Sequence, residues 1–206
     1  MTGKEMMSYK TEQEGFWAGS FGDEYTERNS QGDRTGLFAR VLARTNGIAS
    51  VTELGANMGL NLLAIRNLLP NCRLRGVEIN KSAFARLNSI SDISAHHGSL
   101  LEFSAPPADL TFTSGVLIHI APEALPTAYR KLYELSSRYI VLIEYYNPTP
   151  VEVPYRGHSG RMFKRDWAGD MMDMFADLHL VDYGFFYHRA PIFAAGDTNW
   201  FLLEKR

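Results

Sequence analysis

The residues from Glu53 to Gly59, in the order Glu-Leu-Gly-Ala-Asn-Met-Gly, have types and a spacing that suit binding of a ligand against the main chain. Gly55 and Gly59 lack a Cβ atom, so the backbone can turn sharply and approach a bound molecule, and Asn57 is among the few other residues that tolerate a positive φ. A helix that begins near Leu60 would add free N–H groups. We therefore predict a ligand-binding loop; a plain strand–turn–helix connection with incidental glycines is the alternative.

This loop does not fit a dinucleotide site of the NAD type, although an acid follows it at the right distance. A G-x-G-x-x-G motif from Gly55 needs glycines at positions 57 and 60, where this chain has Asn57 and Leu60. Glu78 ends a predicted strand 78 − 55 = 23 residues after Gly55, close to the interval of about twenty residues at which an acid meets a ribose. A carboxylate accepts from both ribose hydroxyls. Glu78 is predicted to bind a ribose; a solvated acid at a strand end is the alternative.

His119 is the side chain best placed by sequence to accept a proton. It follows the loop after a predicted strand at 108–115, and histidine titrates near neutrality. A histidine bonded structurally at a helix entry is the alternative. Glu144, Tyr145 and Tyr146 end the strand 139–146, at another edge where a substrate could bind, although aromatic residues there are equally consistent with a core position.

Positive charge is concentrated after that strand, at Arg156, His158, Arg161 and Lys164. Arginine binds a carboxylate or a phosphate through two hydrogen bonds at once, so this segment is predicted to bind an anion. A solvated charged loop is the alternative. The spacings of His, Cys, Asp and Glu match no metal site, and the sequence holds neither a nucleophile elbow nor a phosphate P-loop.

The elements that must position these residues alternate between strand and helix. Strands are expected at 50–54, 73–78, 93–97, 108–115, 139–146, 181–187 and 199–204, and helices at 33–44, 60–69, 81–90, 122–135 and 162–178. Asp33 is the expected cap of the first of these helices. The stretch 147–161 is rich in Pro, Gly and charge and is predicted to be an irregular functional loop. Residues 11–29 carry Phe16, Trp17, Phe21 and Tyr25 and are predicted to form broken helices that cover the core or a cofactor.

Composition limits the class of protein. With 206 residues, 45% of them hydrophobic, the chain is expected to form one domain, with a helical cap at 1–45 and a core at 46–206. A net charge of -2 and a pI near 6.3 do not favour nucleic-acid binding. The single Cys72, the polar start at 1–10 and the lack of a long apolar stretch predict a cytoplasmic protein that neither forms an internal disulfide nor spans a membrane. Both a monomer and a homodimer remain open.

The pattern Glu53-x-Gly55-x-Asn57-x-Gly59 resembles the E/D-x-G-x-G-x-G loop of class I S-adenosylmethionine (SAM) methyltransferases, with Asn57 in place of the middle glycine. The resemblance implies an α/β, Rossmann-like sheet of seven strands with helices on both faces, its final strand antiparallel beside the fifth, and an N-terminal helical lid. It also implies SAM as cofactor, with Glu53 near the ammonium group and Ser99 or the N–H of Leu100 near the adenine. The residues expected around SAM are Trp17, Glu53, Gly55, Ala56, Asn57, Gly59, Glu78, Ile79, Ser99, Leu100 and Ser114.

More narrowly, the segments TEQEGFWAGSFGDEYTERN, ELGANMGLN and IEYYNPTPVEVPYRGHSGRMFKRDWAGDMMD resemble the pseudaminic acid biosynthesis-associated methylase family. This resemblance implies a small anionic acceptor, methylated at oxygen or nitrogen, with a nonulosonic acid or a nucleotide sugar as the first expectation.

In this hypothesis each predicted residue has a role in methyl transfer. His119 and Tyr146 are the expected catalytic residues, and the expected substrate-binding residues are Tyr145, Arg156, His158 and Arg161. Three alternatives stay open: a carboxylate-bearing amino acid as acceptor, a non-catalytic SAM-binding scaffold, and an oxidoreductase that uses a nicotinamide cofactor.

Overall fold

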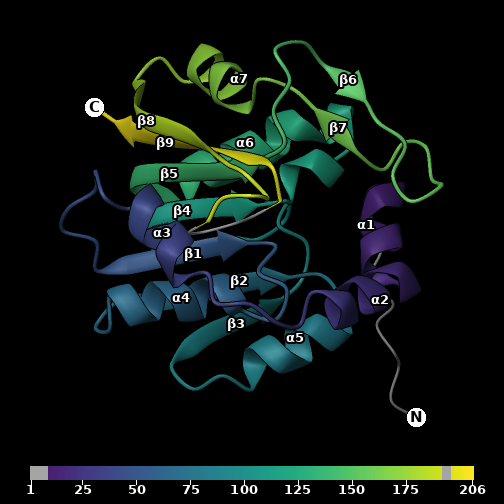
Figure 1. The fold of residues 1–206 in the computed structure, drawn as a ribbon, viewed down its shortest axis with the longest axis horizontal. Coiled ribbons are helices and arrows are strands. Elements are labelled where there is room, and N and C mark those ends of the chain that lie inside the picture. The colour runs from purple at the N-terminus through teal and green to yellow at the C-terminus, as the bar shows by residue number, and fades with distance from the viewer. Residues whose placement is uncertain (1–8, 192–195) are drawn as a thin grey trace.

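A computed structural model describes residues 9–191 and 196–206 of the chain. Its centre is a seven-stranded sheet in the order β3-β2-β1-β4-β5-β9-β8 (Figure 1). β9 pairs antiparallel with both β5 and β8, whereas the pairs among the first five strands are parallel. The predicted α/β sheet, with an antiparallel final strand beside the fifth, is confirmed. The strands are β1 Ser50–Leu54, β2 Arg73–Glu78, β3 Ile93–His97, β4 Ala108–Ser114, β5 Ser136–Glu144, β8 Leu178–Phe186 and β9 Thr198–Lys205.

Helices cover both faces of this sheet because the parallel strands carry apolar side chains on both sides. Along β5, Ile140 and Leu142 belong to one core cluster and Val141 and Ile143 to the other, as the period of two in a strand requires. The first cluster includes side chains from α6 (Leu125–Glu134) and α7 (Trp167–Met174). The second includes side chains from α3 (Thr35–Val41), α4 (Leu60–Leu68) and α5 (Lys81–Asn88).

Two short helices precede this core, α1 at Glu12–Ala18 and α2 at Ser20–Arg28. Thr11 and Glu14 form a capping box that fixes the start of α1. Both helices lie at the side of the molecule where the parallel strands end (Figure 1). They belong to the predicted N-terminal cap at 1–45, whose residues 1–8, like most of the polar start at 1–10, lie outside the described residues. The same range includes α3, whose Phe38 and Val41 are buried in the second core cluster.

The predicted cap at Asp33 needs a correction. The helix begins at Thr35 with Arg34 as the N-cap residue, and the Asp33 carboxylate accepts a hydrogen bond from the Thr35 N–H at 2.8 Å. Asp33 thus supports the start of α3 from one residue before the cap. The helix is also shorter than the predicted range 33–44.

Two predictions for the segment after β5 are wrong. The stretch 147–161 is not wholly irregular, since β6 (Val151–Glu152) pairs with β7 (Phe163–Lys164). The predicted helix at 162–178 begins only at Trp167, where Asp166 accepts from the Gly169 N–H at 3.0 Å. It ends at Met174, and Leu178 already belongs to β8. The apolar pattern of 162–178 is therefore shared between a hairpin strand, a helix and the start of a strand.

In the part of the chain that the structure describes, no helix combines the length and the apolar character that crossing a membrane requires.

Candidate functional site

A cavity opens where β1, β2 and β4 end, beside the cap helices. Parallel α/β sheets bind ligands at this edge, where the strand order reverses between β1 and β4. The residues that line it include Gln13, Glu14, Trp17, Tyr25, Arg34, Glu53, Gly55, Ala56, Asn57, Asn61, Glu78, Ile79, Asn80, Ser99, Leu100, Ser114, Val116 and His119.

The glycine loop forms one wall of the cavity, in the strained geometry that its sequence predicts. Gly55, Asn57 and Gly59 have φ values of 77°, 48° and 87°. A Cβ atom on Gly55 would stand 2.5 Å from the side chain of Val116, so glycine is required there. The N–H groups of Gly55 and Ala56 bond to the Val77 carbonyl at 2.8 and 2.9 Å, which pins the loop to β2. Asn57 adopts the left-handed conformation in place of the usual middle glycine.

Glu53, at the end of β1, is a buried carboxylate with one unpartnered oxygen. The Asn61 side-chain amide donates to its Oε1 at 2.6 Å, while Oε2 has no partner in the part of the chain that the structure describes. Burial raises the pKa of Glu53 to about 8. The Arg34 guanidinium in turn donates to the Asn61 Oδ1 at 2.8 Å, so Arg34, Asn61 and Glu53 form a chain of hydrogen bonds along the cavity. A buried oxygen without a partner is costly to keep unless a ligand supplies the donor.

Glu78, at the end of β2, differs from Glu53 because both of its oxygens accept main-chain hydrogen bonds. Oε2 accepts from the Asn57 N–H and Oε1 from the Asn80 N–H, each at 2.7 Å. Burial raises the pKa of Glu78, and these hydrogen bonds oppose the rise. Glu78 therefore fixes the glycine loop relative to the start of α5 while it lines the cavity.

Ser99 and Glu14 connect the cap to the loop after β3. The Ser99 hydroxyl donates to Glu14 Oε1 and accepts from the Leu101 N–H at 3.0 Å. Glu14 Oε2 accepts from the Thr11 N–H at 3.0 Å, within the capping box. Ser99 thus has a partner in the cap, while Leu100 and Ile79 line the same end of the cavity.

His119 lines the same cavity from a short 3-10 helix, Leu117–His119. Its Nδ1 is 2.6 Å from the Arg161 carbonyl oxygen. A carbonyl can only accept, so Nδ1 carries the proton in the neutral ring and Nε2 is left as an acceptor. Burial lowers the pKa of His119 to about 4, and the ring is neutral at neutral pH.

Glu144, at the end of β5, holds the turn that carries His119. Its Oε1 accepts from the N–H groups of Val116 and Leu117 at 3.1 Å each, and its Oε2 accepts from Ile118 at 3.4 Å. Burial raises the pKa of Glu144 to about 7, against the effect of these hydrogen bonds. Both oxygens are bonded to the main chain, as in Glu78.

The structure brings most of the predicted cofactor residues together. Ten of the eleven line the cavity, and the eleventh, Gly59, is the N-cap residue of α4. His119 also lines the cavity, whereas Tyr146 is not among the lining residues, is 37% exposed and packs near Phe201.

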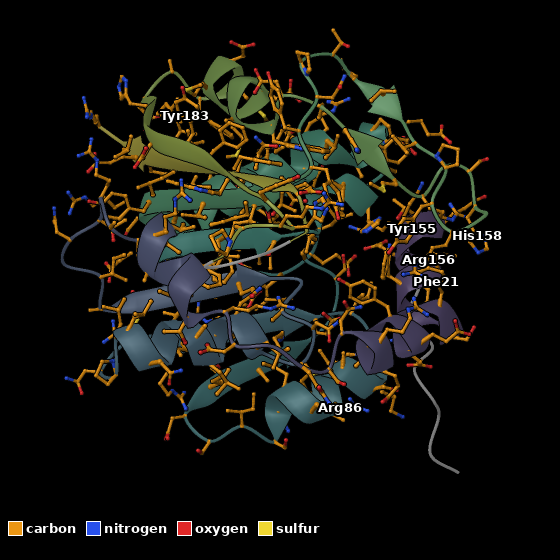
Figure 2. The ribbon with its side chains drawn as sticks, viewed as in Figure 1. Phe21, Arg86, Tyr155, Arg156, His158 and Tyr183 are labelled. Atoms are coloured by element: carbon orange, nitrogen blue, oxygen red, sulfur yellow. The ribbon has the colours of Figure 1, made fainter. Side chains whose placement is uncertain are left out.

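The predicted substrate residues Tyr145, Arg156, His158 and Arg161 are likewise not among the lining residues. His158 packs against Phe16 and Phe21 of the cap, and Arg161 pairs with Glu12 at 3.3 Å and lies over the Phe16 ring. Figure 2 shows His158, Tyr155 and Arg156 beside Phe21 at the edge of the cap. Together with the hydrogen bond from Gln13 to the Gly160 carbonyl at 3.0 Å, these contacts fasten α1 to the segment 155–161.

Several residues that line the cavity, Arg34 and Asn61 among them, are not identified by the sequence pattern. Arg34 and Asn61 stand 27 positions apart, so no local motif relates them. For Tyr25, the sequence indicates only that it is one of several aromatic residues in the cap. One feature of the sequence could have indicated Arg34 and Asn61. Each is a polar residue at the start of a helix whose apolar face is buried.

Comparisons with known proteins agree on the fold. No protein-family model and no curated protein match the sequence. Among solved structures, the 1,6-didemethyltoxoflavin-N1-methyltransferase of Burkholderia thailandensis, with bound 1,6-didemethyltoxoflavin and S-adenosylhomocysteine (SAH), aligns over 98% of this chain and 92% of its own, with a TM-score of 0.73 and 14% identity.

Two other methyltransferases align nearly as well. The magnesium protoporphyrin IX methyltransferase of Synechocystis PCC 6803 with bound SAH aligns over 94% of this chain and 97% of its own, with a TM-score of 0.66 and 13% identity. The glycopeptide N-methyltransferase MtfA aligns over 89% and 99%, with a TM-score of 0.63 and 14% identity. The identities are low, so the likeness concerns the fold.

Proposed function

We propose, from the premise that this chain has the fold of SAM-dependent methyltransferases, that it transfers a methyl group from SAM to oxygen or nitrogen of a small molecule. The proposal rests mainly on one observation. Oε2 of Glu53 is buried and has no partner among the described residues, and Glu53 lines the cavity together with the glycine loop and Glu78. SAM carries an ammonium group that would supply the missing donor.

The two ends of the hydrogen-bonded chain Arg34–Asn61–Glu53 suit the two charged groups of an amino acid. Glu53 Oε2 would accept from the ammonium group of the methionine moiety, and the Arg34 guanidinium would bind its carboxylate. The ammonium charge would lower the raised pKa of Glu53 and favour the ionised carboxylate that accepts. Asn61 donates to Glu53 and accepts from Arg34, so its amide holds both groups in orientation.

The remaining cavity residues fit the nucleoside. Glu78 lines the cavity with both oxygens already oriented by main-chain N–H groups, and each oxygen keeps a lone pair for a ribose hydroxyl. Ile79 and Leu100 would contact the adenine. Because the Ser99 hydroxyl bonds to Glu14, we assign adenine recognition to the main chain near Leu100 and assign Ser99 to holding the cap.

When bound, SAM supplies an electrophilic methyl group for an in-line displacement. The protein must hold the acceptor atom within about 3–3.5 Å of the methyl carbon and exclude water. His119 lines the cavity, and its Nε2 is the acceptor of the neutral ring, so it could orient and receive the proton of an O–H or N–H group. Glu144 keeps His119 in place through the turn that precedes it.

A sugar acid is a second candidate for the acceptor, as the sequence resemblance implies, with a carboxylate-bearing amino acid as its variant. Arg34, the one cationic side chain among the described residues that line the cavity, is assigned above to the carboxylate of SAM, so an anionic acceptor would need Arg156 or Arg161. Arg156 and Arg161 would have to move to reach it. The structural neighbours act on chemically different small molecules, so the fold leaves the acceptor open.

The test is incubation of the protein with methyl-labelled SAM and a small-metabolite extract, followed by mass spectrometry. We expect label on an oxygen or nitrogen atom of one small molecule. Binding of SAM without any transfer would favour the non-catalytic scaffold. Binding of NADH in place of SAM would favour an oxidoreductase and contradict the proposal.

A further inference from the structure

Aromatic side chains gather around His119 at the cavity. We define Trp17, Tyr25, His119 and Tyr155 as the aromatic wall. The first three line the cavity, and Tyr155 packs against His119 with ring centroids 5.0 Å apart. The Trp17 ring centroid lies 4.4 Å from that of His119 and 5.2 Å from that of Tyr25. Because residues of α1, α2, the 3-10 helix and the β6–β7 hairpin all contribute, the wall is a product of the tertiary fold.

The rings around Trp17 leave it without a stacked partner among the described residues. Phe16, Phe21 and Tyr25 stand at 86°, 88° and 87° to the indole plane. His119 and Tyr155 are tilted, by 48° and 36°, and the Tyr155 ring centre is 6.4 Å away. An aromatic ring gains from an offset parallel neighbour, which a planar ligand in the cavity could supply.

The charged side chains that line the cavity are not part of the aromatic wall, although Arg34 acts electrostatically on Tyr25. The charged side chains that line the described cavity are Glu14, Arg34, Glu53 and Glu78. Glu14 bonds to Ser99, and the other three form the cofactor end proposed above. The wall itself offers a neutral imidazole, two phenols and an indole.

Two polar atoms of the wall have no hydrogen-bond partner among residues 9–191 and 196–206. The buried indole Nε1 of Trp17 is a donor without an acceptor, and Nε2 of His119 is an acceptor because Nδ1 is bonded to the Arg161 carbonyl. A ligand that is planar and apolar, with one hydrogen-bond acceptor and one O–H or N–H group, would satisfy both atoms.

We propose that the methyl acceptor is a neutral, planar aromatic or heteroaromatic molecule that carries a hydroxyl or ring N–H group and binds against the aromatic wall. This inference rests on the proposed function. The acceptor's oxygen or nitrogen lone pair forms the new bond to the methyl carbon, and the C–S bond breaks with its electron pair going to sulfur. The acceptor's proton goes to Nε2 of His119 and then to water, which leaves the ring neutral for the next turnover.

The experiment uses two probes with the same carbon skeleton, planar 2-naphthol and non-planar decahydro-2-naphthol. Each is titrated into the full chain saturated with SAH and followed by calorimetry, with N-acetylneuraminic acid as a third ligand. We expect saturable binding of 2-naphthol, at least tenfold tighter than binding of the other two ligands. Equal binding of the two naphthol skeletons, no binding of 2-naphthol at millimolar concentration, or preference for the sugar acid would overturn the inference.

Two substitutions test whether 2-naphthol binds at the aromatic wall. Trp17→Leu and, separately, Tyr155→Leu should weaken 2-naphthol about tenfold and weaken SAH less. Tyr183→Leu is the matched control, since Tyr183 is 66% exposed on β8, far from the cap in Figure 2, and should change neither affinity. If both wall variants bind 2-naphthol as tightly as the unaltered chain, the inference is wrong. Failure of SAH to bind at all would refute the proposed function and, with it, this inference.

Discussion

The floor and the cover of the cavity are built in different ways. Glu53 and Glu78, at the ends of β1 and β2, line the floor, and Glu144, at the end of β5, holds the turn before His119. Glu78 and Glu144 bond with both oxygens to main-chain N–H groups. The cover consists of the helices α1 and α2, which the β6–β7 hairpin contacts through aromatic rings and a few polar side chains. One of these contacts, the pair of Arg161 with Glu12, has its acid 85% exposed.

Because of this difference, the floor of the cavity keeps its shape, whereas the cover can open. Main-chain N–H groups bonded to buried carboxylates resist movement, so the floor keeps its shape for a charged cofactor. Partly exposed side-chain contacts separate at low cost, so the cover can admit a ligand and close over it. Glu53 is the exception in the floor, because its Oε2 has no donor among the residues that the structure describes, and this exception identifies the atom that would meet the ligand.

The largest effect is expected from Glu144→Ala. The change leaves the N–H groups of Val116, Leu117 and Ile118 without their acceptor inside the protein. We expect a loss of about 3 kcal/mol in the free energy of unfolding, because each unsatisfied buried donor costs about 1–3 kcal/mol. Urea unfolding measures it, with Glu144→Gln as a milder variant that keeps one acceptor oxygen. An unchanged midpoint would show that the floor is not held in this way.

Arg34→Gln tests the cofactor end of the cavity. A hydrogen bond to a charged group contributes about 1.5–3 kcal/mol, so SAH should bind roughly ten- to a hundredfold more weakly. Methylthioadenosine lacks the amino-acid end and should bind the variant and the unaltered chain equally. Arg44→Gln is the matched control, because Arg44 is an exposed arginine beyond the end of α3. An equal loss for both ligands would contradict the assignment of Arg34 to the carboxylate.

The unpartnered Glu53 predicts a dependence of stability on pH. Its folded pKa of about 8 is above the ordinary value of 4.5, so the folded state binds the proton more tightly. This contribution to stability is complete below pH 4.5 and is lost as the pH rises through 8. Glu53→Gln, which cannot titrate, should therefore gain stability relative to the unaltered chain between pH 5 and pH 8. Urea unfolding at pH 5 and at pH 8 measures the effect. If the difference in unfolding free energy between the variant and the unaltered chain is the same at both pH values, the raised pKa of Glu53 is refuted.

The smallest effect is expected in the cover. Arg161→Gln removes the ion pair with Glu12 and the contact with Phe16 but keeps the carbonyl that binds His119. We expect a loss of at most about 1 kcal/mol in unfolding free energy, since exposed ion pairs contribute 0–1 kcal/mol. The same variant decides the role predicted from the sequence, since a tenfold rise in KM for an anionic acceptor would support substrate binding by Arg161.

The parts of the site that depend on local sequence could be predicted. The glycine loop, Glu53 and Glu78 follow from residue type and spacing along one βαβ unit, and the five parallel strands follow from their apolar runs. The Arg34–Asn61 contact and the β6–β7 pairing could not be predicted, because each joins residues far apart in sequence without a periodic signal. The cytoplasmic location, the link to a sugar pathway and the oligomeric state remain predictions.

The central claim, that this cavity binds SAM, is tested most directly by calorimetric titration of the chain with SAH and, separately, with NADH. We predict that one SAH binds per chain and that NADH gives no binding heat. Binding of NADH, or no binding of SAH, would contradict the account.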